Sequence, residues 1–563
     1  MKTLLKRSIQ LLYILAAVVL ISCNARNPGP SKEMISGIKL KRGSVISCGS
    51  IGKEYGEVDF DISCDKKFTT DFNLAIALLH SFEYDESEKV FARIIDENPN
   101  CAMAYWGVAM CNFHALWTAP TEAELLKGNK AVEIAQAITG KSKRESDYIN
   151  AIAIFYKDWN TIDHLTRCNS YEKAMEKIHT TYPEDKEAAI FYALALDASA
   201  KPTDKSFVNQ KKAGAILNSI YPSAPDHPGV IHYIIHTYDY PGLAELALPS
   251  ARKYAQVAPS SAHALHMPSH IFTRLGLWDE CIKSNLESVA SARCYGEQAG
   301  IKGHWDEELH GMDYLVYAYL QKGKNNLAEE QLNYLKTFTN VYPVNFKVAY
   351  AFAAIPSRIY LENKNWNEAA RLQFNPFGLS WAKFPWQESI IHFTRLLGSV
   401  HLNKNDLAAF ELNKLKQLRD TLVKQKDPYK SKQVAIQIKS GEAWIHFGSG
   451  QKKQALAEMK LAANMEDSTE KHPVTPGEVI PARELLADMF FDLGYYEDAL
   501  LCYETVLQKS PNRFNSLYGA GRSAEKLVNT QKTNLYYKQL LSLKDSTNAK
   551  KPELLAIAKF FSQ

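Results

Sequence analysis

The stretches HPGVIHYIIHTYDYP (227–241) and SAHALHMPSHIFTRLGLW (261–278) decide the fold that the sequence predicts. Each contains two histidines four residues apart, and the second pair follows the first after 34 residues. A spacing of four places both side chains on one face of an α-helix. A period of 34 residues is that of a helix–turn–helix unit that stacks into a solenoid. We therefore expect successive repeats to carry matched histidine pairs on the same face. The pairs are His232 with His236 and His266 with His270.

Helical pairs of this kind extend along the chain. The run TTDFNLAIALLHSFEYDESEKVFARIIDENP (69–99) has small residues, Ala75 and Ser87, where two helices must approach closely, and Pro99 ends the second helix. No strand pattern of any length interrupts the helices, so the predicted fold class is all-α. The further expected pairs are 144–158 with 169–182, 186–200 with 208–220, 228–240 with 243–257, 262–276 with 279–295, 305–322 with 326–340, 344–362 with 364–371, 386–403 with 406–424, 430–448 with 451–466, 480–493 with 496–509 and 513–527 with 530–543.

The run GYYEDALLCYETVLQKSPNRFNSLYGAG (494–521) resembles the tetratricopeptide repeat consensus. The segments LLHSFEYDESEKVF, AMAYWGVAM and HPG…HYIIH…HALHMPSHIF resemble a group of large bacterial proteins of this type. The resemblance implies a tetratricopeptide-repeat-like α-solenoid over residues 67–563. It also implies that the first helices of the repeats line a concave groove that binds peptides or partner segments. The segment HPVTPGEVIP (472–481) indicates a break in the array near residues 467–480.

The N-terminus has the pattern of a secretory signal peptide over residues 1–22, with a basic start and an apolar run from Leu11 to Ile21. That run is short for a transmembrane helix. The end of the signal, Leu-Ile-Ser-Cys at 20–23, resembles a bacterial lipobox, which implies cleavage before Cys23 and acylation of its thiol. Asn24 after the cysteine implies sorting to the outer membrane, facing the periplasm. The alternative is ordinary signal cleavage, with Cys23 incidental.

Residues 23–66 contain Pro and several Gly, and we expect a tether with at most a short β segment. Cys48 and Cys64 are candidates for a disulfide in an oxidising periplasm, although spacing does not decide the pairing. The cysteines farther along fall in apolar helical patterns, where small buried cysteines are common.

The composition and net charge indicate which classes of partner the chain can bind. The 563 residues are 46% apolar and carry a net charge of only +4, without a long basic stripe. The chain can therefore bury a large core, and nucleic-acid binding is not expected.

The histidines suggest a metal site in the groove. Adjacent helices pack about 8–10 Å apart, so facing imidazoles of neighbouring repeats can share one ion. Zinc, or another imidazole-favouring metal such as copper, nickel or iron, is the natural occupant. The candidate metal ligands are His232, His236, His266, His270, His310 and Asp313, and the other candidate groove residues are His80, His114, Asp239, His263 and Arg274.

An internal comparison separates these histidines from the scaffold. The segment IPSRIYLENKNW (355–366) matches MPSHIFTRLGLW (267–278) at a displacement of 88 residues, and both contain a proline inside an expected helix. The second copy has Ala351, Ala354 and Arg358 at the positions of the histidines in the first copy. The scaffold therefore does not require histidine at these positions.

Two functions fit the sequence. The first is a membrane-anchored scaffold that binds a protein or peptide at the cell envelope, and it is the one that we expect. The second is a metalloprotein, and as an enzyme it would be a metal-dependent hydrolase or oxidoreductase. Neither histidine pair has the HExxH form of zinc peptidases, and no nucleotide-binding or nucleophile motif is present. Histidines in a groove can also hydrogen-bond across repeats or stack on neighbouring tyrosines without any ligand.

Overall fold

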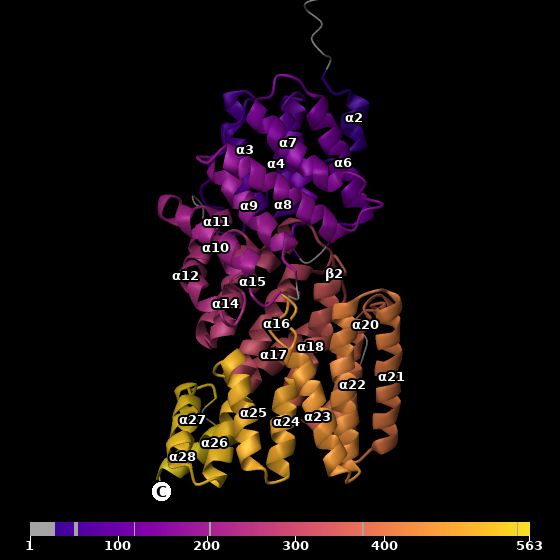
Figure 1. Cartoon of the computed structure of the whole chain (residues 1–563), viewed down its shortest axis with the longest axis vertical. Helices are drawn as coiled ribbons and strands as arrows, with labels where there is room; N and C mark the ends of the chain where they lie inside the picture. The colour runs from indigo at the N-terminus through magenta and orange to yellow at the C-terminus, as the bar shows by residue number, and fades with distance from the viewer. Residues whose placement is uncertain are drawn as a thin grey trace, which may run out of the picture. The chain divides into compact units, whose positions relative to one another are not determined.

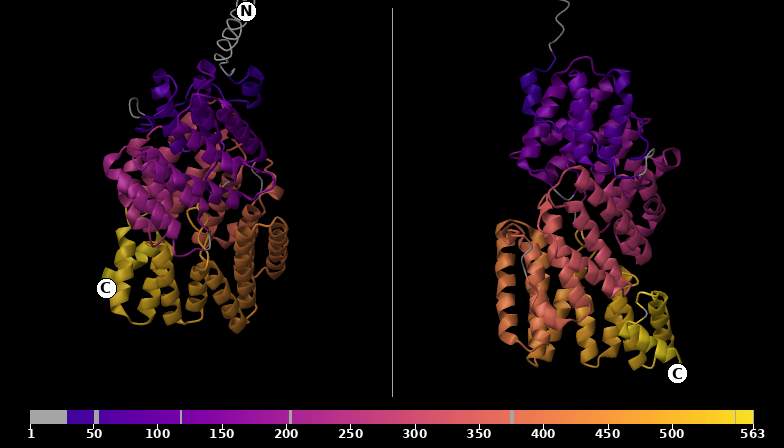
Figure 2. Two further views of the ribbon diagram at one scale, coloured as in Figure 1. Left: turned by 45° about the horizontal axis from the view of Figure 1, so that its top comes forward. Right: turned by 180° about the vertical axis from the view of Figure 1, so that it is seen from behind.

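The computed structural model describes residues 29–49, 54–116, 119–201, 204–373, 377–548 and 550–562. The chain forms two compact units, here called unit 1 (Met1–Val45 and Glu57–Ala200) and unit 2 (Ile46–Gly56 and Lys201–Gln563). Both units consist of helices in the described residues, apart from two-residue strands in unit 2 (Figures 1 and 2). The predicted signal peptide and Cys23 lie outside the described residues. No helix among the described residues combines the length and the apolar character needed to cross a membrane.

Unit 1 is built from helices that pack against their neighbours along the chain. In the first pair, small side chains allow the helices to meet, and Ser87 Oγ donates a hydrogen bond to the carbonyl oxygen of Ala75 at 2.7 Å. The ring of Phe91 packs so closely on Gly107 that a Cβ there would lie 2.2 Å from it. The helices are α2 (Lys32–Gly37), α3 (Thr69–His80), α4 (Tyr84–Glu97), α5 (Ala102–Cys111), α6 (Glu122–Ala137), α7 (Lys143–Tyr156), α8 (His164–Thr181) and α9 (Lys186–Ser199), with the 3₁₀ turn η1 (Lys66–Phe68).

Helix α6 is a repeat helix that our sequence prediction missed. Thr121 caps its N-terminus, and Glu124 completes a capping box with it. This S/T-x-x-E pattern is a signal for a helix start that the sequence contained. With α6 included, α5 and α6 form a pair, so unit 1 continues the alternation without a gap.

Unit 2 confirms the predicted helical pairs from 228–240 with 243–257 onward, with boundaries that shift by a few residues. The predicted pair 186–200 with 208–220 is not confirmed, because its first helix belongs to unit 1 and its second to unit 2. Its helices pair in succession, as expected for a tetratricopeptide-repeat-like α-solenoid. The elements are α10 (Val208–Ile220), η2 (Tyr221–Ser223), α11 (Pro228–Thr237), η3 (Ala244–Ala247), α12 (Leu248–Val257), α13 (Ala262–His266), α14 (Pro268–Leu275), α15 (Trp278–Gln298), β1 (His304–Trp305), α16 (Asp306–Gln321), α17 (Asn325–Leu335), β2 (Val341–Tyr342), α18 (Phe346–Glu362), α19 (Trp366–Ala370), η4 (Trp381–Lys383), α20 (Pro385–His401), α21 (Asn405–Lys424), α22 (Pro428–Gly448), α23 (Lys452–Asp467), α24 (Ala482–Asp492), α25 (Tyr496–Lys509), α26 (Phe514–Lys526), α27 (Thr530–Ser542) and α28 (Pro552–Ser562).

Proline divides one of these first helices in two. The expected helix 262–276 consists of α13 and α14, with Met267 between them and Pro268 at the first position of α14. Proline lacks an N–H group and is favoured at a helix start. Met267 itself has helical backbone angles, φ −53° and ψ −36°, so the chain stays in the helical conformation between α13 and α14, and each carries histidines. In α18 the corresponding Pro356 lies inside a continuous helix.

The segment 468–481, here called the inner segment, connects α23 to α24 without helix. The carbonyl oxygen of Gly477 accepts a hydrogen bond from Arg358 Nη2 at 2.8 Å. The ring of His472 lies 4.7 Å from that of Phe346, between centroids. The inner segment therefore packs on α18, and at these positions the chain itself covers the face of that first helix.

The described part of the expected tether packs on the helices. In unit 1, Ile38 and Phe60 are buried, and the Phe60 ring contacts those of Phe72 and Trp106. In unit 2, the backbone N–H of Ser260 donates to the carbonyl oxygen of Glu54 at 3.1 Å. Apolar residues of the segment 29–66 therefore contribute to the core. The described residues of that segment form no strand.

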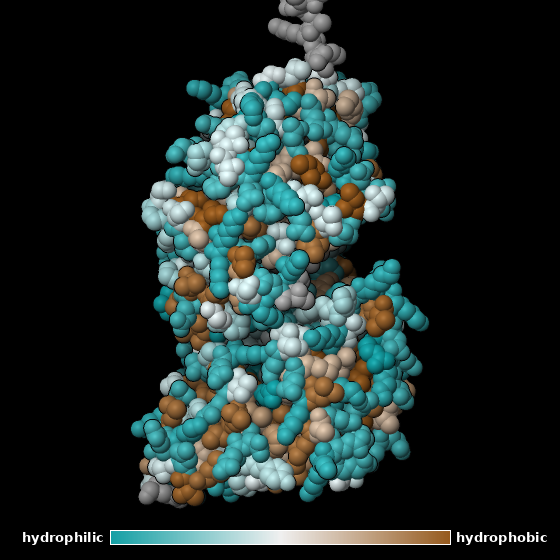
Figure 3. Space-filling model, in the orientation of Figure 1, coloured by the Kyte–Doolittle hydropathy of each residue, from teal (hydrophilic) through white to brown (hydrophobic). Residues whose placement is uncertain are grey.

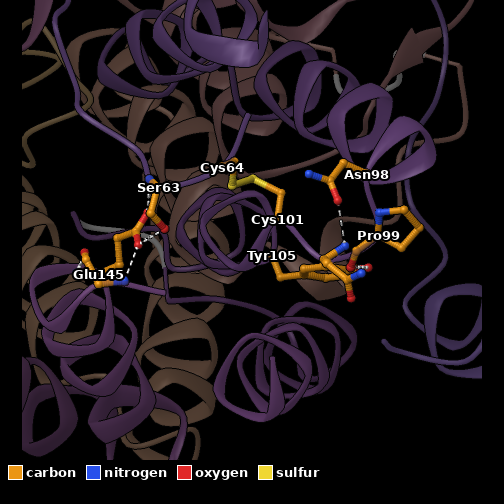
Figure 4. The surroundings of a disulfide bond; sticks show 9 residues. Ser63, Cys64, Asn98, Pro99, Cys101, Tyr105 and Glu145 are labelled. Atoms are coloured by element: carbon orange, nitrogen blue, oxygen red, sulfur yellow. Dashed lines mark hydrogen bonds between the residues drawn. A yellow bond between two sulfur atoms is a disulfide. The ribbon is translucent and has the colours of Figure 1, made fainter. Parts of the chain in front are cut away.

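The disulfides differ from the pairing that we considered. Cys48 bonds to Cys294 within unit 2, and Cys64 bonds to Cys101 within unit 1 (Figure 4). A bond between Cys48 and Cys64 is therefore wrong for this structure. Chain spacing could not identify the partners, because Cys294 is distant in sequence. The remaining cysteines in the described residues are free and buried: Cys111, Cys168, Cys281 and Cys502.

Removal of the disulfide in unit 1 is expected to destabilise that unit. The Cys64–Cys101 bond spans 37 residues, and loop-closure entropy for such a length corresponds to about 4 kcal/mol. The double variant Cys64→Ser/Cys101→Ser should lower the free energy of unfolding of unit 1 by about that amount in a urea titration. Under a thiol reductant the difference from the wild type should disappear. Equal stability under oxidising conditions would contradict this prediction.

Candidate metal centre

Six histidines of unit 2 form one cluster, and four helices position them. Their helices start with ordinary capping signals: Pro228 lies at the first turn of α11, and the side chain of Ser261 accepts from the N–H of Ala264 at the start of α13. The four-residue spacing directs His232 and His236 to one side of α11. His266 ends α13 and His270 lies in the first turn of α14. The cluster consists of His232 and His236 on α11, His263 and His266 on α13, His270 on α14 and His310 on α16.

The cluster divides into two trios of potential ligands. In each trio, one ligand atom from every histidine lies within 4.8 Å of the other two. The outer trio is His232, His236 and His263, and the inner trio is His266, His270 and His310.

The ring nitrogens within each trio lie at coordination spacing. His232 Nε2 lies 2.9 Å from His236 Nε2 and 3.1 Å from His263 Nε2. In the inner trio, His266 Nε2 lies 3.1 Å from His270 Nε2. Two nitrogens bound to one ion at about 2.0–2.1 Å would lie about 2.9 Å apart at a right angle and about 3.4 Å apart at the tetrahedral angle. The observed separations fall within this range.

The two trios differ in exposure. All three residues of the inner trio are buried, whereas His236 and His263 of the outer trio are partly exposed. The trios adjoin each other, since the ring centroids of His236 and His270 are 6.2 Å apart and those of His263 and His266 are 6.5 Å apart. The outer trio is therefore the part of the cluster that solvent reaches.

Asn285 of α15 fixes the tautomer of His266. The Nδ2 group of Asn285 donates to the carbonyl oxygen of Cys281 at 2.8 Å, which directs Oδ1 toward the imidazole. Oδ1 lies 2.7 Å from His266 Nδ1, and because it can only accept, Nδ1 must carry the hydrogen. In the neutral ring, Nε2 is then left with a lone pair.

Asp239 has the same effect on His270. Its Oδ2 lies 3.0 Å from His270 Nδ1, and its Oδ1 accepts from Arg274 Nε at 2.8 Å. Lys471, from the inner segment, lies 3.2 Å from Oδ2. Although burial acts in the opposite direction, these cations hold the pKa of Asp239 well below its usual range. The carboxylate is therefore ionised, and His270 donates its Nδ1 hydrogen to it. Such carboxylate–imidazole pairs orient metal ligands in many sites.

The cluster is also held by apolar and aromatic contacts. The ring of Tyr314 stacks on that of His270 at 4.9 Å between centroids, and Tyr254 stacks on His232 at 5.2 Å. Burial lowers the pKa of five cluster histidines below the usual value, and proximity to other rings adds to the effect for most of them. The five are His236, His263, His266, His270 and His310. Burial also lowers the pKa of Lys471 to about 8. The rings are therefore held as neutral imidazoles, the form that binds metals.

Several predicted site residues have other partners. The carboxylate of Asp313 forms an ion pair with Arg358, so it is directed to α18 and is absent from both trios. Asp239 and Arg274 lie behind His270 as supporting residues. The remaining two belong to unit 1: His80 Nε2 lies 2.9 Å from Glu187 Oε2, and His114 Nε2 lies 3.2 Å from Glu124 Oε1.

Sequence reasoning missed Asn285 and Lys471. Asn285 lies on a second helix, outside the periodic pattern of the first helices. Lys471 is separated from Asp239 by 232 residues and lies in a segment that we expected only to interrupt the array. The packing of the inner segment brings Lys471 to the site, and no local pattern indicates this.

Comparisons with known proteins do not assign this chain to a family. No family model matches the sequence, and no curated protein sequence matches it. Solved structures with partial similarity include a human IFIT1 dimer with m7Gppp-AAAA, at 11% identity over 83% of this chain and 94% of that chain, with a TM-score of 0.30. The human IFIT1 dimer with PPP-AAAA has 13% identity over 83% and 94%, with a TM-score of 0.34. The APC/C hetero-tetramer Cut9–Hcn1 has 10% identity over 87% and 89%, with a TM-score of 0.31. At these scores the fold assignment rests on the helix pairing described above.

Proposed function

We propose that the chain binds a transition-metal ion at the inner trio of the histidine cluster. The observation that carries the proposal is the 3.1 Å approach of His266 Nε2 to His270 Nε2. Asn285 and Asp239 accept the Nδ1 hydrogens, so neither neutral ring has a hydrogen to place between the two Nε2 atoms. Two lone pairs that face each other at this distance repel. A cation bound by both removes the repulsion, and His310 supplies a third ligand.

The donor set indicates the class of metal. Neutral imidazoles suit zinc, copper, nickel and iron(II), whereas calcium and magnesium prefer oxygen ligands. A shared proton is the alternative occupant of the space between His266 and His270. The lowered pKa of both rings disfavours that proton at neutral pH.

Metal analysis of protein purified without a histidine tag tests the proposal. The wild-type chain should retain a transition metal through gel filtration, and the double variant His266→Ala/His270→Ala should lose the ion that the inner trio binds. The matched control is His446→Ala, a half-buried histidine of unit 2 whose partner is Glu458. It should retain the wild-type metal content. A wild-type protein that stays metal-free after incubation with zinc or copper and gel filtration would overturn the proposal.

Replacement of the carboxylate behind His270 is expected to weaken metal binding. Asp239→Asn removes the charge that orients the imidazole, and loss of such supporting partners typically lowers metal affinity 10–100-fold. The variant also leaves Arg274 and Lys471 without their anion, so its fold should first be checked by circular dichroism. Competition with a chromophoric chelator measures the affinity. Asp420→Asn, at an exposed position, is the control, and an unchanged affinity in Asp239→Asn would contradict the supporting role.

We propose a protein-binding scaffold as a second function. The repeat architecture supports it, and so does helix α21, on which Leu407 and Phe410 are half exposed and one turn apart. On the face in Figure 3, other exposed apolar residues form small scattered groups in a hydrophilic surface. A photo-crosslinker at Phe410 should capture an envelope protein or peptide in cells and should do so equally with chelator. Absence of any specific product would exclude α21 as the binding face.

We also propose that the mature chain is anchored by lipid on Cys23 and is located at the outer membrane, facing the periplasm. The lipobox-like sequence at 20–23 supports this, as do two disulfides, which persist in oxidising compartments. Labelling with a clickable fatty acid should mark the wild type and leave Cys23→Ala unmarked. Equal labelling of both proteins would refute the anchor.

A further inference from the structure

The outer trio is a complete second set of ligands beside the proposed metal. Its three Nε2-bearing rings belong to α11 and α13, and its closest nitrogen pairs lie at 2.9 Å and 3.1 Å, as in the inner trio. One ion cannot take all six histidines. Six nitrogens around a single ion would lie within about 4.2 Å of one another, whereas the six donor atoms form two separate groups at a 4.8 Å limit.

The two sets are close enough for their ions to share a ligand. An ion about 2.0–2.1 Å from a ring nitrogen lies about 3 Å from the ring centre. The rings of His236 and His270 have centres 6.2 Å apart, and those of His263 and His266 are 6.5 Å apart. The ion separations that these distances allow include the few Å of two-metal sites with a bridging oxygen ligand.

The surrounding charges favour metal ions of low charge. Imidazoles bind metals as neutral ligands. The charged side chains near the two trios include the anion Asp239 and the cations Arg274 and Lys471, and Lys347, which is paired with Asp306 and Glu307, also acts on the inner trio. Two divalent ions repel each other about four times as strongly as two monovalent ions at the same distance. Copper is the imidazole-binding metal that is stable in the monovalent state, and as a divalent ion it also binds imidazole most tightly in the first-row series.

We propose that the six-histidine cluster is a dinuclear copper centre, in which the outer trio holds the ion that exchanges ligands with solvent. This inference rests on the proposed metal function. The partial exposure of His236 and His263 gives a water, hydroxide or dioxygen molecule a route to the outer ion, while the inner ion is enclosed. Three protein ligands leave each ion an open position for the bridging ligand.

Copper stoichiometry and electron paramagnetic resonance test the inference. Wild-type protein, loaded with Cu(I) and then oxidised in air, should contain two copper ions per chain and give little resonance signal, because bridged Cu(II) ions couple their spins. The variant His232→Ala/His236→Ala should contain one copper ion, with a full signal. If that variant does not fold, His263→Gln should give the same result, because it removes one ligand from a partly exposed position.

The outcomes separate this inference from the proposed function. One copper ion in the wild type, with a full signal, would overturn the dinuclear centre and leave a single metal site. Two copper ions with a full signal would overturn the bridge between them. A protein that binds two zinc ions and excludes copper would overturn the choice of metal. No bound metal would refute the proposed function itself.

Discussion

Removal of metal is expected to lower the stability of unit 2 strongly, and the loss should depend on the inner trio. A ligand that binds only the folded state stabilises it by about 2.7 kcal/mol when its free concentration is 100 times the dissociation constant. The unfolded chain does not hold His266, His270 and His310 together, since His310 is 40 residues from His270. Filling both trios should about double the effect. Thermal unfolding of metal-loaded and chelated protein measures it.

The histidine variants provide the control for this experiment. His266→Ala/His270→Ala should show a smaller metal-dependent shift of the unfolding temperature than the wild type, because only the outer trio can still bind an ion. The control His446→Ala should keep the full metal-dependent shift. If chelation leaves the unfolding of the wild type unchanged, the histidines have no metal-dependent role in stability.

Replacement of Arg513 should have the largest effect of any single substitution outside the cluster. Its fully buried guanidinium donates to Glu484 at 2.7 Å and 2.8 Å and to Glu362 at 2.6 Å. These contacts join α26 to α24 and α18. Arg513→Leu leaves two buried carboxylates without their cation, and removing one partner of a buried ion pair typically costs about 3–5 kcal/mol. A urea titration that follows unit 2 measures the loss.

Further variants test whether unpaired buried charge explains the loss of stability in Arg513→Leu. Adding Glu362→Gln and Glu484→Gln to Arg513→Leu should restore part of the lost stability, because no unpaired charge then remains buried. Arg419→Leu, at a partly exposed position beside Asp420, should change the free energy of unfolding by less than about 0.5 kcal/mol. If the triple variant is less stable than Arg513→Leu, packing rather than charge explains the effect.

The fold could be predicted from the sequence because its signals are local. Apolar periodicity, small residues such as Ala75 and Ser87, and the 34-residue spacing of the histidine pairs each act within one repeat. Our prediction missed helix α6, although Thr121 and Glu124 form its capping box. The local signal for this helix was therefore present in the sequence. The position of the inner segment and the partners of Cys48 and Cys64 depend on contacts between distant residues, which local patterns do not contain.

The candidate site was predictable in part for the same reason. The two i, i+4 histidine pairs lie beside each other, but they fall in different trios and do not form one ligand set. His263, expected only as a groove residue, joins the outer trio, while Asp313 is drawn away by Arg358. Arg358 occupies the position in α18 that corresponds to His270 in α14. The same scaffold position therefore supplies an ion pair in one repeat and an imidazole of the cluster in another.

X-ray diffraction with anomalous scattering at the metal absorption edge tests the metal centre most directly. Crystals of untagged protein loaded with copper should show two anomalous peaks, one within bonding distance of the ring nitrogens of His266, His270 and His310 and one beside those of His232, His236 and His263. A well-ordered cluster without an anomalous peak, in protein exposed to copper and to zinc, would contradict the account and leave the six histidines as a metal-free part of the core.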